Sequence, residues 1–280
     1  MRLGVNTLIW SAEFDPGVIP FEKLKKAEVE GLEVPAFNPK DLDTKALKQI
    51  LKENKLACTL CSINPEGTNP ISKDAKVRDK AFKHWKKVIE TAAELDCELI
   101  AGPSYAPVGD LPGRRRTDEE WSLGVEFHQK LAPALKKSGV HLAVEPLNRF
   151  ETYFLNTAED AVRFVEEIDS PQIGILLDTF HSNIEDKSVA VAYRQCGKHL
   201  KHVHTCENDR GIPGSGHIDW PGVLRSLQVM GYDGWLTIES FNANIPALSA
   251  ATAIWRDLAP HPDDIAVQGT AFLKKLWAAV

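Results

Sequence analysis

The sequence predicts an α/β protein that folds as one (β/α)₈ TIM barrel, a single domain over residues 1–280. Eight short apolar runs of strand length alternate with segments whose apolar residues have helical spacing, a pattern typical of parallel strands joined by crossover helices. A length of 280 residues suits one such barrel. An open doubly wound sheet is the alternative, but no G-x-G-x-x-G turn follows the first strand.

The first four strand–helix units fill the N-terminal half of the chain. Strands are expected at residues 3–9, 32–34, 56–63 and 98–101, and helices at 20–30, 45–54, 75–95 and 118–137. The first helix is predicted because Phe21, Leu24 and Ala27 recur at helical spacing before Gly31, and glycine commonly ends a helix. The Pro/Gly loop over residues 102–116 is too long for a plain linker in so compact a chain, so we expect it to have a function.

The remaining units follow the same alternation. Strands are expected at residues 140–145, 173–177, 199–204 and 234–238, and helices at 158–168 and 220–230. The run at 173–177 is continuously apolar, as expected for a strand that is buried on both faces. Thr157 is the expected N-cap of the helix that follows it, and Gly231 is expected to end the last helix.

The composition indicates a soluble globular protein of the cytoplasm. A net charge of −6 gives no basic footprint for nucleic acid, and the one basic run, 114–116, is followed at once by acidic residues. Five cysteines with no secretory leader before them indicate free thiols in a reducing compartment. Cys58 and Cys61 have C-x-x-C spacing, but without a second pair they predict no zinc site. No apolar run approaches the length of a membrane span.

Metal-binding side chains stand at the carboxyl ends of four successive predicted strands. They are Glu145, Asp178, His204 and Glu239. These ends converge at the mouth of a barrel, where three carboxylates would repel one another unless a cation lay between them. Three oxygen donors and one imidazole, with no thiolate, favour Mn²⁺, Co²⁺ or Mg²⁺ over Zn²⁺. His202 alternates with His204 and is the alternative ligand.

Further polar and aromatic residues follow the same strands. Glu151, His181 and Arg210 stand in the loops after three of the ligand strands. An arginine beside a metal can hold a hydroxyl or a developing oxyanion, and a histidine can donate to an adjacent oxygen. The G-I-P-G-S-G segment at 211–216 could cradle a phosphate, but it lacks a strand-to-helix context, so a flexible mouth loop is the preferred interpretation. Five aromatic residues after strands are candidates for either core or pocket wall: Trp10, Phe14, Phe37, Tyr105 and Phe241.

Four linked motifs give the chain a resemblance to a known family. They are V-E-P-L-N-R-F-E at 144–151, L-D-T-F-H-S-N-I-E at 177–185, H-V-H-T-C-E-N-D-R-G at 202–211 and I-E-S-F at 238–241. With these motifs the chain resembles the ketose 3-epimerases, the D-tagatose and D-psicose 3-epimerase group of the xylose isomerase-like TIM barrels. The motifs occur in order and the resemblance spans nearly the whole chain.

The resemblance implies a metal-dependent isomerase that epimerises free ketoses at C3, of the D-tagatose, D-psicose, D-fructose or ketopentose type. It implies Mn²⁺ or Co²⁺ as the cofactor and a homodimer or homotetramer as the assembly. The implied roles are metal binding by Glu145, Asp178, His204 and Glu239, proton transfer by Glu145 and Glu239, and substrate contacts by Glu151, His181 and Arg210.

The chemistry of epimerisation agrees with these residue types. Inversion at C3 requires removal of a proton next to the C2 carbonyl, which becomes acidic only when the carbonyl oxygen is polarised by a Lewis acid. Two carboxylates on opposite sides of the substrate can then take one proton and return another.

Three other functions are alternatives. One is an aldose–ketose isomerase such as hydroxypyruvate isomerase, which has a similar barrel. A second is an endonuclease IV-like hydrolase, which should have more histidines at its strand ends and a basic face. A third is a sugar-binding protein without activity.

Overall fold

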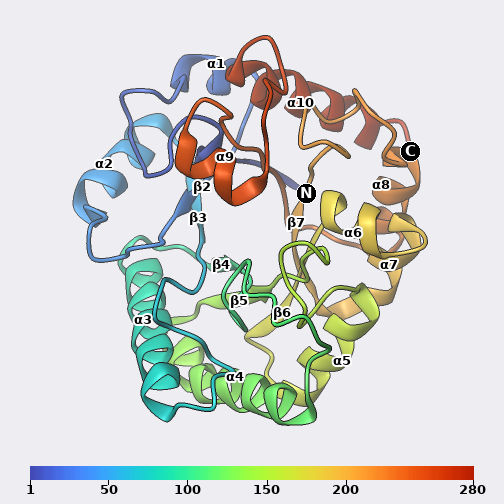
Figure 1. The fold of residues 1–280 in the computed structure, drawn as a ribbon. Helices are drawn as coiled ribbons and strands as arrows, with labels where there is room; N and C mark the ends of the chain where they lie inside the picture. The colour runs from blue at the N-terminus through green and yellow to red at the C-terminus, as the bar shows by residue number, and fades with distance from the viewer.

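Eight parallel strands close into a barrel in the computed structural model, which describes residues 1–280 (Figure 1). The strands are β1 (Arg2–Asn6), β2 (Gly31–Pro35), β3 (Ala57–Cys61), β4 (Leu99–Gly102), β5 (His141–Val144), β6 (Ile173–Asp178), β7 (Leu200–His204) and β8 (Trp235–Ile238). Each strand pairs in parallel with the next along the chain, and β8 pairs with β1. The predicted (β/α)₈ fold is therefore confirmed.

Helices surround the strands, most of them in an outer ring, whereas α9 (Pro246–Thr252) lies inside this ring (Figure 1). They are α1 (Phe21–Lys26), α2 (Thr44–Asn54), α3 (Ala75–Glu94), α4 (Asp118–Ser138), α5 (Ala158–Ile168), α6 (Thr179–Glu185), α7 (Val189–Cys196), α8 (Trp220–Val229), α9 (Pro246–Thr252) and α10 (Pro262–Trp277), with short 3₁₀ turns η1 (Thr7–Ile9) and η2 (Gly197–His199). The helices α6, α7, α9 and α10 were not among the predicted elements. No helix combines the length and the apolar character that a membrane crossing requires.

Local hydrogen bonds explain where several elements begin and end. The strand predicted at 3–9 stops at Asn6, because the Asn6 side-chain oxygen accepts the Leu8 N–H at 2.9 Å and turns the chain into η1. The predicted N-cap Thr157 is confirmed, since its hydroxyl accepts the Asp160 N–H at 3.2 Å. The remaining strands lie within a few residues of their predicted ranges.

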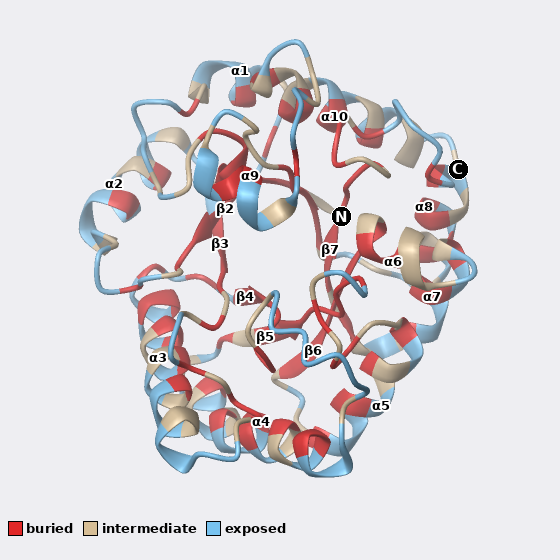
Figure 2. Ribbon diagram, in the orientation of Figure 1, coloured by how far each residue is buried: buried red, intermediate tan, exposed pale blue.

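The buried side chains form two layers, one on each face of the barrel wall. Helices turn their buried faces toward the strands and their exposed faces outward (Figure 2). A separate small cluster alternates along the strands with this outer layer, so it fills the barrel interior. Its members are Leu99, Ala101, Ala143, Leu176 and Trp235. Apolar packing thus closes one end of the barrel and leaves the mouth for polar groups.

Gly102, the last residue of β4, allows three strands to meet closely at the mouth. Its φ is 130°, and its carbonyl accepts the Glu145 N–H at 3.3 Å. A Cβ at this position would overlap the backbone oxygen of Ser62, which follows β3. Both the backbone conformation and the close approach therefore require glycine here.

We expect Gly102→Ala to lower the free energy of unfolding by about 3 kcal/mol, because a strained φ and an overpacked contact each cost roughly 1–3 kcal/mol. The measurement is urea unfolding followed by circular dichroism. Gly67→Ala is the matched control: its φ is also positive, at 76°, but no atom lies within 4 Å of the added Cβ. That variant should lose only about 1 kcal/mol, and equal losses in the two variants would contradict the role of the Ser62 contact.

Candidate metal and active site

The four side chains predicted as metal ligands meet at the mouth of the barrel. Glu145 follows β5, Asp178 ends β6, His204 ends β7 and Glu239 follows β8. All four are buried, and one potential ligand atom from each lies within 4.8 Å of the others. The structure therefore holds a cluster of three carboxylates and one imidazole that is able to bind a metal ion.

Burial and mutual charge shift the pKa values of the three carboxylates in different directions. Burial raises the pKa of Glu145 to about 8, with the charges of Glu239 and Asp178 adding to the shift. Burial also raises the pKa of Asp178 to about 6. At Glu239 the charges of His204 and Arg210 outweigh burial and hold the pKa at about 2. The cluster thus contains more carboxyl groups than the cationic side chains beside it can neutralise.

Two atoms at the centre of this cluster have no hydrogen-bond partner although they are buried. They are Glu145 Oε1 and His204 Nδ1, which lie 3.6 Å apart. His204 Nδ1 also lies 3.5 Å from Glu239 Oε1. Buried polar atoms are nearly always paired, and a cation between these atoms would satisfy the two that lack a partner. The donor set therefore fits a divalent metal ion.

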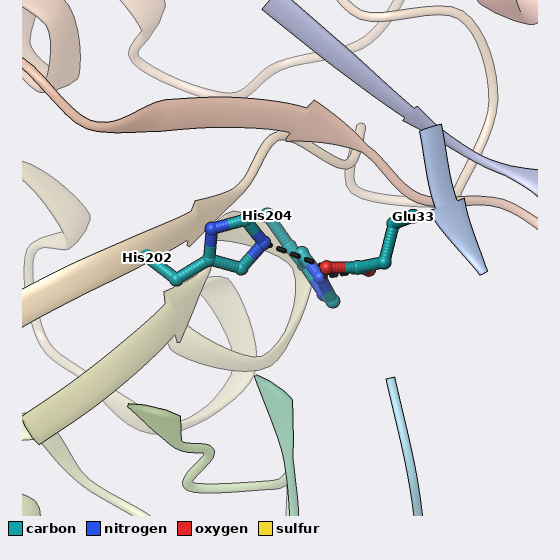
Figure 3. Close-up of side chains that lie close together, drawn as sticks. All are labelled: Glu33, His202 and His204. Atoms are coloured by element: carbon teal, nitrogen blue, oxygen red, sulfur yellow. Dashed lines mark hydrogen bonds and ion pairs between the residues drawn. The ribbon is translucent and has the colours of Figure 1, made fainter. Parts of the chain in front are cut away.

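Glu33, in the middle of β2, fixes the orientation of His204. Its two carboxylate oxygens lie 2.8 Å from the Nε2 atoms of His202 and His204, and Figure 3 shows both imidazoles turned toward it. Asn6 and Thr59 donate two further hydrogen bonds to the same carboxylate. In the neutral form of His204, a proton on Nε2 leaves the Nδ1 lone pair facing Glu145 and Glu239, the tautomer that a metal ligand needs.

Glu33, His202 and His204 form a buried group in which the carboxylate is fully paired. Burial acts to raise the pKa of Glu33, but His204 and His202 outweigh it, so the pKa lies well below its usual range. Both carboxylate oxygens already accept N–H and O–H donors, which leaves them saturated as ligands for a second ion. His202, the alternative ligand, groups with Glu33 and His204 and not with the three carboxylates Glu145, Asp178 and Glu239.

Glu33 escaped prediction, although its sequence context holds a signal. It is the charged residue in G-L-E-V-P, a run otherwise suited to a buried strand. An ionisable residue inside such a strand requires a buried partner. The sequence does not identify that partner, because His204 is 171 positions away.

Arg210 is held between the metal cluster and two aromatic rings. Its Nη1 donates to Glu239 Oε2 at 2.6 Å and lies 3.3 Å from Asp178 Oδ2. The guanidinium carbon lies 4.2 Å from the ring centroid of Phe180 and 4.9 Å from that of Phe241. Such stacking and pairing restrict the guanidinium to one plane.

His181 faces Arg210 with its proton-bearing nitrogen. The Asn148 N–H donates to His181 Nδ1 at 3.1 Å, so the neutral ring carries its proton on Nε2. Burial, and then the charge of Arg210, lower the pKa of His181 well below its usual value. His181 Nε2 and Arg210 Nη2 lie 3.1 Å apart and both are donors in this state. An oxygen acceptor placed beside both would receive both hydrogen bonds.

Asn148 also links His181 to Glu151. Its side-chain nitrogen donates to Glu151 Oε1 at 2.8 Å, and burial raises the pKa of Glu151. The three residues predicted to contact substrate, Glu151, His181 and Arg210, line one cavity together with three residues of the metal cluster, Glu145, His204 and Glu239. Asn148 is thus the residue that orients His181.

The segment 211–216 is organised by a buried carboxylate. Glu207 accepts hydrogen bonds from the Gly214 N–H and the Trp220 Nε1–H at 2.8 Å each, and from the N–H groups of Asn208 and Ile218 at 3.1 Å each. The Gly214 amide is thus engaged within the protein, which agrees with a mouth loop rather than a phosphate cradle.

The cavity above the metal cluster has a volume of about 810 Å³. Phe37 and Phe241 line it. Trp10 and Tyr105 are buried instead: the Trp10 indole donates to Asp263 and the Tyr105 hydroxyl donates to the Glu145 carbonyl oxygen at 2.9 Å. Two of the five candidate aromatics therefore form cavity wall.

Comparisons with known proteins agree with this geometry. The model of the xylose isomerase-like TIM barrel family matches residues 21–276. A probable ketose 3-epimerase of Synechocystis sp. is 34% identical over 99% of this chain and 97% of its own length. A D-psicose 3-epimerase of Ruminiclostridium cellulolyticum is 31% identical over 94% of this chain and 92% of its own. A D-allulose 3-epimerase of Methylomonas sp., crystallised with D-allulose, superposes with a TM-score of 0.93 at 27% identity, covering 98% of this chain and 96% of that one.

We expect Glu33→Gln to weaken divalent-metal binding about 10–100-fold, because the amide cannot accept from both imidazoles and His204 loses its fixed tautomer. The measurement is calorimetric titration of chelator-treated protein with Mn²⁺. Glu53→Gln on the exposed face of α2 is the matched control and should bind as the unaltered protein does. Unchanged affinity in Glu33→Gln would contradict the orienting role of Glu33.

Proposed function

This chain belongs to the ketose 3-epimerases of the xylose isomerase-like TIM barrel family, and we propose that it inverts the configuration at C3 of free ketoses with the help of a divalent metal ion. It is accordingly an isomerase of carbohydrates. The observation that carries the proposal is the buried cluster of Glu145, Asp178, His204 and Glu239, with two unpaired atoms that call for a cation.

We propose Mn²⁺ as the ion, with Co²⁺ or Mg²⁺ as the alternatives. Glu145, Asp178, His204 and Glu239 would hold it, the histidine through Nδ1. Carboxylate oxygens with one imidazole suit these ions, and the site offers no thiolate among its four donors. When bound, the ion supplies positive charge that stabilises the negative charge developing on the substrate oxygens.

Glu145 and Glu239 are the proposed proton-transfer groups. They follow β5 and β8, so they approach the mouth from different sides of the barrel. One carboxylate takes the C3 proton from one face of the sugar, and the other returns a proton to the opposite face, which inverts the centre. The roles reverse for the opposite epimer, as microscopic reversibility requires.

Arg210, His181 and Glu151 are the proposed contacts to the substrate oxygens O1, O2 and O3. Arg210 and His181 present N–H donors to the same space, where an oxygen that gains negative charge would accept from both. Glu151, whose raised pKa favours retention of a proton, can exchange hydrogen bonds with a sugar hydroxyl. These contacts orient the sugar so that C3 lies between the two proton-transfer carboxylates.

The charge of the cavity wall supports a free sugar rather than a sugar phosphate. Arg210 is the one lysine or arginine among the residues that line the cavity, and it is already paired with Glu239 and Asp178. A phosphate group at the remote end of the sugar would therefore meet no unpaired lysine or arginine, which disfavours its binding.

We further propose that the protein works in the cytoplasm as a homodimer or homotetramer and has no nucleic-acid partner. The resemblance to the ketose 3-epimerases implies the assembly, and the net charge of −6 supports the absence of a nucleic-acid partner. Sedimentation velocity would measure the oligomeric state directly.

We expect deuterium from D₂O to enter C3 when the Mn²⁺-loaded protein converts D-psicose to D-fructose. The C3 hydrogen is removed and replaced during each inversion, and solvent exchanges with the carboxyl groups that carry it. Nuclear magnetic resonance of the recovered sugars locates the label. Label at C1 or C2 in place of C3 would instead identify an aldose–ketose isomerase.

We expect Glu145→Gln and Glu239→Gln each to lower kcat for D-psicose by about 10²–10⁴-fold, the usual contribution of an acid–base group. Metal content is measured in parallel by mass spectrometry, because both residues are also proposed ligands. Glu166→Gln, on the exposed face of α5, is the matched control and should keep full turnover. Full turnover in Glu239→Gln would rule out this mechanism, and no turnover in the unaltered protein would favour a sugar-binding protein.

A further inference from the structure

The cavity has one polar end and one apolar end. Its acidic, basic and imidazole lining residues all belong to the metal cluster or to the proposed substrate contacts: Glu145, Glu151, His181, His204, Arg210 and Glu239. The rest of the wall is mainly aliphatic and aromatic. At about 810 Å³, the cavity falls in the upper part of the range of roughly 300–1,000 Å³ that encloses drug-sized ligands. A free hexose is much smaller than such a ligand, so it leaves the apolar end unfilled.

The apolar end is formed by loops and by α9 rather than by the strands. Its walls come from the segments after β2 and β4, from the loop after β5, from α6 and from the α9 region. The apolar side chains that these segments contribute include Phe37, Val108, Phe150, Ile184, Leu248 and Ala251. Because they come from separate segments, they surround a space rather than form a flat patch.

Phe150 is held in place on this wall although it is 71% exposed. Its N–H donates to the Asn148 side-chain oxygen at 2.9 Å. The preceding residue, Arg149, pairs with Glu185 through two side-chain hydrogen bonds and one from its backbone N–H. These bonds fix the backbone of the loop at Phe150, whose exposed side chain lines the cavity, and an exposed large apolar surface at a cavity commonly marks a ligand contact.

The few hydroxyl groups on the apolar walls are already used within the protein. The Ser62 hydroxyl donates to the Ala36 carbonyl oxygen at 2.9 Å. The Thr252 hydroxyl donates to the Leu248 carbonyl oxygen at 2.8 Å. A hydrophilic sugar tail would leave water for a wall with few free donors, whereas an apolar group would gain from the same transfer.

We propose that the cavity takes ketoses that carry an apolar alkyl or aryl group at the end remote from C1 to C3, in addition to free ketoses. The inference rests on the proposed function, because the polar end must hold O1, O2 and O3 for the remote end to reach the apolar walls. The reaction at C3 is unchanged. The substituent adds binding contacts with Phe37, Phe150 and the α9 side of the cavity.

The test compares D-psicose with its 6-O-benzyl ether on the Mn²⁺-loaded full chain. Each buried methylene contributes about fourfold in binding, so kcat/KM for the ether should exceed that for D-psicose about tenfold. A value for the ether at or below that for D-psicose would overturn the inference. If D-psicose itself is not epimerised, the proposed function fails instead, so the two failures are distinguishable.

Ala251→Glu places a carboxylate at the apolar end, at an exposed residue just before the end of α9. The readout is the ratio of kcat/KM for the ether to kcat/KM for D-psicose, because a folding defect would lower both values together. This ratio should fall about tenfold. Val229→Glu is the matched control: Val229 is an exposed residue of α8 outside the cavity, and its substitution should leave the ratio unchanged. An unchanged ratio in Ala251→Glu would overturn the inference.

Sedimentation of the same variants separates a substrate site from a contact between copies. If Ala251→Glu dissociates an oligomer that Val229→Glu leaves intact, the apolar end is an interface and the inference is overturned. An unchanged oligomeric state with a reduced ratio supports it.

Discussion

The buried carboxylates at the barrel mouth are the constraint on which the rest of the site depends. Glu33, Glu145, Asp178 and Glu239 are all nearly inaccessible to solvent, and an uncompensated buried charge costs several kcal/mol. The histidine pair compensates Glu33, and Arg210 compensates Glu239 and part of Asp178. Glu145 Oε1 receives no donor at all. A divalent ion supplies the missing charge, so folding of the mouth and metal binding are thermodynamically linked.

The two histidines at the site are oriented by the same device. Glu33 accepts the hydrogen bond of the His204 Nε2–H, so Nδ1 faces the carboxylates, and the Asn148 N–H donates to Nδ1 of His181, so the Nε2–H of His181 faces Arg210. In each neutral imidazole, the nitrogen that faces the site is thereby fixed as an acceptor or as a donor before any ligand arrives. A site whose donors and acceptors are fixed in advance spends little free energy on reorganisation during the reaction. His204 thus presents a lone pair to the metal site, whereas His181 presents an N–H donor to the substrate side, although the two rings are chemically identical.

The side chains at the strand ends could be predicted from the sequence, because the carboxyl ends of all strands in a barrel meet at one mouth. Glu145 and His204 needed only the strand–helix period to be brought together. Glu33 could not be assigned in this way, since it lies inside its strand and its partner comes from the far half of the barrel. Asn148 orients His181 through its backbone N–H, which any residue could offer, and its side chain bonds Glu151 and the Phe150 N–H, contacts that depend on how the loop folds. The helix α9, which forms part of the apolar end of the cavity, was not predicted, because a helix as short as Pro246–Thr252 shows no long apolar period.

The two ends of the cavity differ in what supports them, and this difference bears on specificity. The metal cluster stands on strand ends that are hydrogen-bonded on both sides within a closed barrel, which holds donor atoms to the small tolerances that proton transfer demands. The apolar end stands on loops and α9, where substitutions disturb few backbone hydrogen bonds and are tolerated more easily. Motifs at strand ends can therefore be shared among proteins that act on different sugars. The strand-end motifs determine which carbon of the sugar reacts, whereas the loops determine which groups the cavity accepts on the rest of the substrate.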